Sequence, residues 1–187
     1  MDNANLIIAC VVVLVVAIAI GAWLYLRKQR TDRLRARFGP EYDHVVQERG
    51  DQKRAEAVLE MRQKRVERLI IRPLSPADRE RFAELWRSTQ ARFVDDPRAA
   101  IAEADALVCD VMNTRGYPVG EFEQRAEDVS VDHPLVVENY RTAHDIAMRE
   151  PAGATDTEEL RKAMVCYRAL FDDLLGNVDT LPLRKVG

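Results

Sequence analysis

The most uniform stretch of the chain is an apolar run from Leu6 to Leu26, LIIACVVVLVVAIAIGAWLYL, without one charged or amide side chain. As an α-helix rising 1.5 Å per residue, this run would be about 31 Å long, which matches the ~30 Å hydrocarbon core of a bilayer. Its many Val and Ile residues would favour a strand in water, but in lipid a helix is favoured, because it pairs every backbone N–H and C=O within the segment. Trp23 and Tyr25 lie at one end, where aromatic rings favour the membrane–water interface. The pattern predicts a transmembrane anchor.

Helical spacing of apolar residues continues beyond this run, and no stretch is long enough to predict a strand. The helix is expected to run on to Phe38 and to stop at Gly39-Pro40. Pro40 then begins a short predicted helix, which Gly50 ends. Asp51 is the predicted N-cap of a longer helix over residues 52–70. This helix has one apolar and one charged face, which suits packing on its own domain or, alternatively, a partner helix.

Beyond Pro73 the pattern predicts a helical bundle. Ser75-Pro76 and Asp96-Pro97 each read as an N-cap followed by Pro at the first helical position, and Gly116 ends the second of these two helices. The region from Ser75 to Gly116 is therefore predicted to be an αα-hairpin. Further helices are predicted over residues 121–128, 135–150 and 158–175. The second has Leu135, Val136, Tyr140, Ala143 and Ala147 on its inner face, and Thr155 or Thr157 caps the third.

These elements predict an all-α protein, with an N-terminal transmembrane helix followed by a soluble helical bundle. We divide the chain into a transmembrane anchor (residues 1–26) and a basic membrane-proximal helical stalk (residues 27–72, "the stalk"). A helical bundle domain (residues 73–176, "the bundle") and a flexible tail (residues 177–187) follow.

The distribution of charge predicts the orientation in the membrane. Between Arg27 and Arg37 the chain has six Lys/Arg and one acidic residue, Asp32, whereas the opposite flank of the span has only Asp2. Because an excess of Lys/Arg marks the cytoplasmic side, we expect a single-pass protein of the cell (inner) membrane, with its N-terminus outside and its C-terminal domain in the cytoplasm. The alternative, a cleaved signal peptide, requires a basic N-terminus and a shorter apolar run, and the chain has neither.

The charge distribution also bears on partners. The stalk has 14 Lys/Arg and 8 Asp/Glu, while residues 73–187 have 14 and 22. A basic stalk next to the lipid bilayer predicts contact with anionic lipid head groups. The acidic bundle and the absence of a basic patch mixed with aromatic residues disfavour nucleic acid. Ala17 and Gly21 form one small-xxx-small pair, so a homo-oligomer is a further option beside an unknown protein partner.

Several strings outside the span form a recognisable pattern: RFGPEYD (37–43), IRPLSPADRERF (71–82), FVDDP (93–97), RGYP (115–118), VDHPLVVENYRTAH (131–144) and TEELRKAMVCYRALFDDLL (157–175). Together they resemble an uncharacterised family of bacterial single-pass membrane proteins with a helical cytoplasmic domain. The resemblance implies the same architecture, but it assigns no activity and no functional residues.

Motifs for known chemistry are absent from the sequence, which has no GxGxxG, GxxxxGK[ST], GxSxG or HExxH. We therefore assign no catalytic, cofactor-binding or metal-binding residues and predict no cofactor. A metal site would have to combine His133 and His144 with His44 and nearby acids (Glu48, Asp132 and Glu138). The leading hypothesis is a non-enzymatic interaction or scaffold module at the membrane. The alternative is a small-ligand binder or enzyme with a site between bundle helices near His133, Tyr140 and His144.

Overall fold

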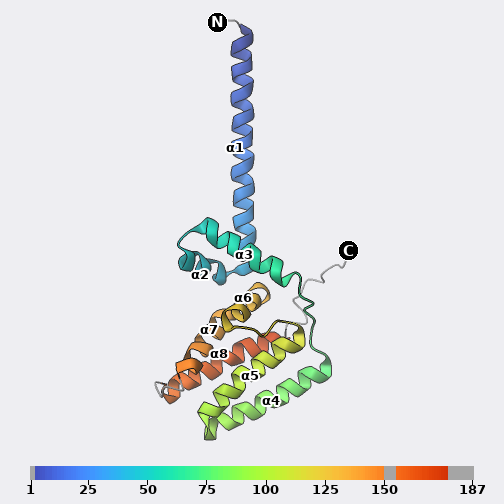
Figure 1. Ribbon diagram of the computed structural model, residues 1–187, viewed down its shortest axis with the longest axis vertical. Helices are drawn as coiled ribbons and strands as arrows, with labels where there is room; N and C mark the ends of the chain where they lie inside the picture. Colours follow the sequence, from blue (N-terminus) through green and yellow to red (C-terminus); the bar gives the residue numbers. More distant parts are fainter. Residues whose placement is uncertain (1–2, 150–154, 177–187) are drawn as a thin grey trace.

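The computed structural model describes residues 3–149 and 155–176, with side chains from residue 12 onward. Within these ranges it consists of eight helices and contains no strand, which confirms the all-α prediction (Figure 1). The predicted tail, residues 177–187, and residues 150–154 of the predicted connection lie outside the described residues. The helices are α1 (Asn3–Phe38), α2 (Pro40–Arg49), α3 (Gln52–Val66), α4 (Pro76–Asp95), α5 (Pro97–Arg115), α6 (Phe122–Asp132), α7 (Val137–Arg149) and α8 (Thr157–Gly176).

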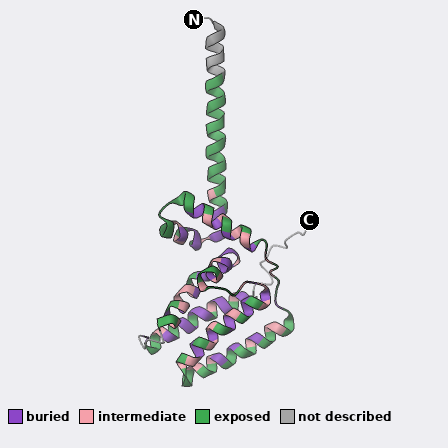
Figure 2. Ribbon diagram, in the orientation of Figure 1, coloured by how far each residue is buried: buried purple, intermediate pink, exposed green. Residues whose placement is uncertain are grey.

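Helix α1 projects away from the rest of the molecule as one unbroken rod (Figure 1). Every residue from Val12 to Arg30 is exposed (Figure 2), and the first buried residue of the helix is Leu34. By length and composition, α1 is the one helix in the described part of the chain that is able to cross a membrane. Its exposed apolar side chains have no protein surface to pack against, so transfer from water into lipid would stabilise them.

Helices α2 and α3 fold back against the C-terminal end of α1 and form a small core with it. Gly39 and Gly50 make the two sharp turns with φ of 48° and 64°, values that favour glycine. As predicted, the Asp51 carboxylate caps α3 by accepting a hydrogen bond from the Arg54 N–H at 2.7 Å. One residue of the bundle joins this core. Its members are Leu34, Phe38, Tyr42, Val45, Ala55, Leu59, Val66 and, from α6, Val131.

The bundle is built around α8, which packs on α5 and α7, while α4 packs on α5 as the predicted hairpin. Trp86 of α4 stacks on Phe171 of α8 with ring centroids 4.5 Å apart. Trp86 and Phe82 are both buried, so these aromatic residues belong to the core. The N-caps Ser75 and Asp96 were predicted from sequence, and each accepts a hydrogen bond from the backbone of its helix.

Four local predictions were wrong. Helix α3 ends at Val66 instead of residue 70. The segment that follows it packs against the end of α5, where the Arg72 N–H donates a hydrogen bond to the Arg115 carbonyl at 2.9 Å. Helix α6 continues beyond residue 128 to Asp132. Helix α7 begins only at Val137, after a turn at Pro134, so Leu135 is exposed and Val137 and Ile146 are buried. Helix α8 is capped by Asp156, whose Oδ1 accepts from the Glu159 N–H at 2.7 Å, and not by a threonine.

Candidate functional site

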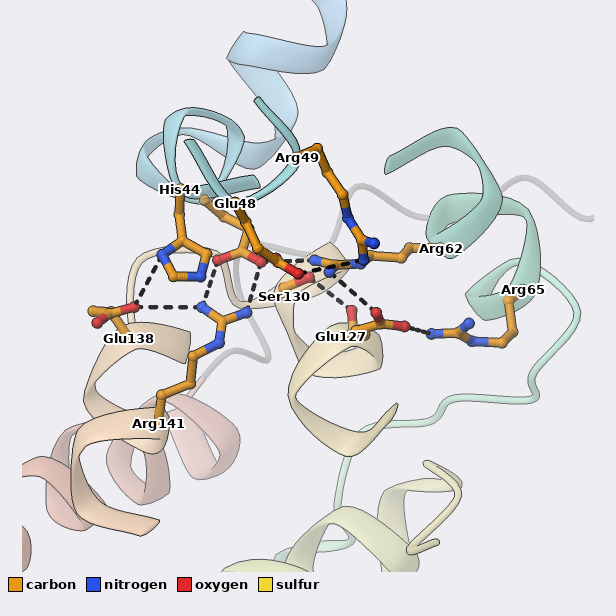
Figure 3. A network of polar contacts seen from close by, with 10 residues as sticks. His44, Glu48, Arg49, Arg62, Arg65, Glu127, Ser130, Glu138 and Arg141 are labelled. Atoms are coloured by element: carbon orange, nitrogen blue, oxygen red, sulfur yellow. Dashed lines mark hydrogen bonds and ion pairs between the residues drawn. The ribbon is translucent and has the colours of Figure 1, made fainter. Parts of the chain in front are cut away.

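The largest connected group of ion pairs among the described residues lies where the stalk meets the bundle, and its centre is buried. It joins two helices of the stalk, α2 and α3, to α6 and α7 of the bundle (Figure 3). We call this group the joint, and it consists of Glu41, Arg62, Arg65, Glu127, Asp128, Glu138 and Arg141.

Glu41 is the centre of the joint. It lies in the first turn of α2, where the helix dipole favours a negative charge. Its carboxylate accepts hydrogen bonds from Arg141 on α7 at 2.7 Å to each oxygen, and from Arg62 on α3 at 2.7 Å. The side chains of Glu41 and Arg62 are only 1% and 3% exposed. One buried carboxylate therefore holds two arginines from different halves of the protein, of which Arg62 is buried and Arg141 is 18% exposed.

A second pair of acids, on α6, completes the joint. Glu127 accepts hydrogen bonds from Arg62 at 3.2 Å and from Arg65 at 2.8 Å, and Arg65 also donates to Asp128 at 2.6 Å. Burial raises the pKa of Glu127, but the two arginines outweigh burial and hold this pKa below its ordinary value. For Asp128 burial dominates and raises the pKa, and its second oxygen has no hydrogen-bond partner among the described residues. The pairing keeps the joint close to charge balance.

The rim of the joint is open to solvent. Glu138 is 65% exposed and lies 3.4 Å from Arg141 and 3.9 Å from His44. Exposed pairs of this kind contribute little to stability, so the buried arginine–carboxylate pairs define the geometry.

A smaller cluster of hydrogen bonds fixes the C-terminal part of α1 to α2 and α3. The Glu56 carboxylate of α3 accepts hydrogen bonds from the Thr31 hydroxyl at 2.6 Å, the Gln52 amide at 2.9 Å and the Tyr42 hydroxyl at 3.0 Å. Burial raises the pKa of Glu56, but these three donors outweigh burial and hold it below its ordinary value. The end of α1 is thus bonded to α2 and α3 through one carboxylate.

Chemically, the joint positions helices and performs no reaction that its geometry reveals. Its arginines point at carboxylates of the same chain, and it contains no nucleophile with an adjacent base. Buried ion pairs add little net stability compared with apolar packing, but their geometry restricts how two surfaces fit together. The joint therefore sets the orientation of the bundle relative to α1.

The structure separates His133 from Tyr140 and His144, with which the sequence analysis grouped it as a ligand or enzyme site. His133 lies 2.5 Å from Asp173 and 3.3 Å from Arg115. Tyr140 instead lies beside Tyr167 of α8, with ring centroids 6.4 Å apart. Asp173 and Tyr167 are six residues apart on α8, which is about 9 Å along the helix. The hollow between α4 and α5, of about 660 Å³, is lined by none of the three.

Tyr140 and His144 do share one environment, inside the bundle. His144 stacks on Phe122 with centroids 3.6 Å apart and lies 3.8 Å from Asp105, while the Tyr140 hydroxyl accepts from Arg125 at 3.1 Å. Burial raises the pKa of Tyr140, and burial likewise raises that of the neighbouring Cys109 thiol. The Tyr140 hydroxyl and the Cys109 thiol are therefore poor proton donors or nucleophiles at neutral pH. We interpret this cluster as part of the packed core.

The predicted metal candidates do not meet either. Glu138 approaches His44, but within residues 3–149 and 155–176 no three His, Cys, Asp or Glu side chains converge as ligands.

The Arg115-Gly116-Tyr117-Pro118 loop packs a corner of the fold, because Arg115 and Tyr117 are buried and Gly116 lies against the Ile70 carbonyl.

Sequence reasoning missed the joint, because Glu41, Arg62 and Arg141 look like ordinary surface charges on amphipathic helices. The one available signal was that Glu41 and Arg141 fall within the RFGPEYD and VENYRTAH strings.

No protein-family model, no curated protein and no solved structure matches this chain. The resemblance to a bacterial membrane-protein family therefore stays a prediction, and the function has to be argued from the geometry alone.

Proposed function

We propose that this protein is a non-enzymatic scaffold of the cell membrane. In this proposal α1 spans the bilayer with its N-terminus outside, and the bundle is held at the cytoplasmic face, where it binds a protein partner. The asymmetry of Lys and Arg around the span supports this orientation. The resemblance to bacterial single-pass proteins agrees with a bacterial inner membrane.

The observation that carries the proposal is the rigid connection between α1 and the folded domain. The helix continues without a break from its apolar part into the stalk core, where Leu34 and Phe38 are buried. Leu34 lies only eight residues beyond Leu26, or about 12 Å along the helix. A flexible tether would only concentrate the bundle near the membrane, whereas this connection holds it at one height.

The joint supports the same function, because it extends this rigidity from the stalk into the bundle. A scaffold gains from a fixed orientation, since a partner then meets the same bundle surface at the same distance from the membrane. An enzyme site near His133, Tyr140 and His144 has no such support, because His133 lies against Asp173 and Arg115, apart from the cluster that contains Tyr140 and His144. We therefore do not propose the alternative function.

Proximity labelling in cells tests the proposal, with the labelling enzyme fused after Gly187 and the full chain expressed at its native level. Reproducible labelling of a small set of cytoplasmic and membrane proteins is the expected result. The matched control places the same fusion on a chain with Glu41→Gln, which loosens the joint but keeps the anchor; the labelled set should become broader. Labelling of exported proteins would show the opposite topology, and labelling of abundant proteins alone would argue against a scaffold.

A further inference from the structure

Helix α3 lies beside the segment of α1 that directly follows the apolar run. The Gln52 amide lies 3.4 Å from the Thr31 hydroxyl, and Arg30 forms an ion pair with Glu60 at 2.6 Å. These contacts place the first half of α3 level with residues 30 and 31 of α1. Figure 1 shows α3 crossing α1 between its projecting part and α6.

This position corresponds to the depth of lipid head groups. Thr31 is five residues beyond Leu26, or about 8 Å along the helix axis. The head-group layer adds roughly 5–8 Å to each side of the hydrocarbon core. Since a helix with its side chains is about 10 Å across, the membrane-facing side of α3 would reach into this layer. This step rests on the proposed insertion of α1.

The outer face of α3 has the composition that such a position requires. Lys53, Ala57, Met61 and Lys64 recur at helical spacing and are all exposed. Of the acidic side chains of α3, Glu60 is paired with Arg30, and Glu56 accepts hydrogen bonds from Thr31 and Tyr42. Arg62 is buried and points toward the bundle, while Arg65, four residues after Met61, lies at the edge of this face and binds the acids of α6. The exposed face of α3 is thus basic, with one large apolar side chain, Met61.

We propose that this face of α3 binds the head groups of anionic phospholipids and is a second contact with the membrane beside α1. The chemistry is complementary, because Lys53 and Lys64 form no ion pair within the described residues and an ammonium group binds a phosphate as a point charge. Met61, 60% exposed, is able to enter the acyl boundary between them. Two contacts in place of one limit the tilt of the bundle relative to the membrane surface.

The test is photo-crosslinking of the full-length protein in vesicles of phosphatidylcholine, with or without phosphatidylglycerol. A photoreactive amino acid replaces one residue at a time: Ala57 on the outer face of α3, Trp23 in the apolar run, or Val94 at the exposed end of α4. We expect lipid adducts at positions 23 and 57 and none at position 94. Only the adduct at position 57 should increase when phosphatidylglycerol is present.

Charge-reversal variants test the basis of the contact. Lys53→Glu combined with Lys64→Glu should lower the phosphatidylglycerol adduct at position 57 at least five-fold, since one basic residue near an anionic surface corresponds to about five-fold in affinity. The matched control, Arg161→Glu with Lys162→Glu, makes the same change of charge on exposed residues of α8 and should leave the adduct unchanged. Both variants keep the basic residues 27–37 that are expected to determine topology.

The outcomes separate this inference from the proposed function. An adduct at position 23 without one at position 57 would overturn the inference and leave the anchor intact. The inference would also be overturned if the adduct at position 57 did not increase with phosphatidylglycerol or did not decrease in the lysine variants. A crosslink at position 57 between two copies of the chain would overturn it as well. No adduct at position 23 would show that α1 is not inserted, which would overturn both.

Discussion

Arg141 binds Glu41 through two parallel hydrogen bonds of 2.7 Å, although the two residues are 100 positions apart in the chain. Each terminal nitrogen of the guanidinium faces one carboxylate oxygen or the other, which is the most directional form of an ion pair. Arg62 occupies the remaining side of the same carboxylate. Because Glu41 belongs to the stalk and Arg141 to the bundle, this pair decides how the two parts face each other.

Neutralising Glu41 should therefore weaken the contact between the stalk and the bundle. Glu41→Gln leaves Arg62 and Arg141 without their shared anion in a buried site, and we expect a loss of about 3–5 kcal/mol in the free energy of unfolding. Urea titration of the detergent-solubilised protein, followed by circular dichroism, measures this loss. Glu138→Gln is the matched control at the exposed rim and should cost about 0–1 kcal/mol. Equal effects of the two variants would contradict the central role of Glu41.

Gly116 is predicted to tolerate no side chain. Its φ is 100°, and a Cβ there would lie 2.4 Å from the Ile70 carbonyl oxygen, so Gly116→Ala must displace the segment that follows α3. Gly50→Ala is the control, because φ is 64° but the surrounding space is open. We expect about 1–2 kcal/mol for the strain at Gly50 and a clearly larger loss at Gly116. Thermal unfolding of both variants checks this order, and similar melting temperatures would refute it.

Acid should weaken the attachment of the C-terminal part of α1 to α2 and α3. The pKa of Glu56 is lower in the folded protein than its unfolded value of 4.5. The folded state then binds fewer protons than the unfolded state, so the contribution of Glu56 is complete above pH 4.5 and is lost as the pH falls through the folded pKa. The protection factors of the backbone amides around residues 31–42, which correct the exchange rate for its intrinsic pH dependence, should fall in this range. In Glu56→Gln these amides should already be poorly protected at pH 7, and their protection should change less as the pH falls.

The stalk core and the bundle core should respond separately when a substitution creates a cavity in one of them. Phe38→Ala removes a fully buried ring from the stalk core, and Trp86→Ala removes the ring that stacks on Phe171 in the bundle. Each should cost about 3–5 kcal/mol. Hydrogen exchange should show Phe38→Ala releasing mainly α1 to α3, and Trp86→Ala releasing mainly α4, α5 and α8. Uniform release in both variants would instead mean that the joint makes the domain one cooperative unit.

Much of the local structure could be predicted because it depends on neighbours in the sequence. Asp51, Ser75 and Asp96 cap their helices through groups three residues away, and Gly39, Gly50 and Gly116 adopt left-handed backbone that other residues avoid. The errors occurred where tertiary contacts override local preference. Residues 67–70 would continue an amphipathic helix in isolation, but the contact with the end of α5 ends α3 earlier.

Hydrophobic periodicity and capping act over a few residues, so local signals were enough to predict the apolar helix, the helical class of the remaining chain and most of the helix ends. Which charges are buried depends instead on contacts between distant helices. Glu41, Arg62 and Arg141 resemble any solvated charges when each helix is viewed alone, and they become a joint only when α2, α3 and α7 bring them within hydrogen-bonding distance. The separation of His133 from Tyr140 and His144 has the same cause, since residues close in sequence can face different neighbours once a turn such as that at Pro134 intervenes.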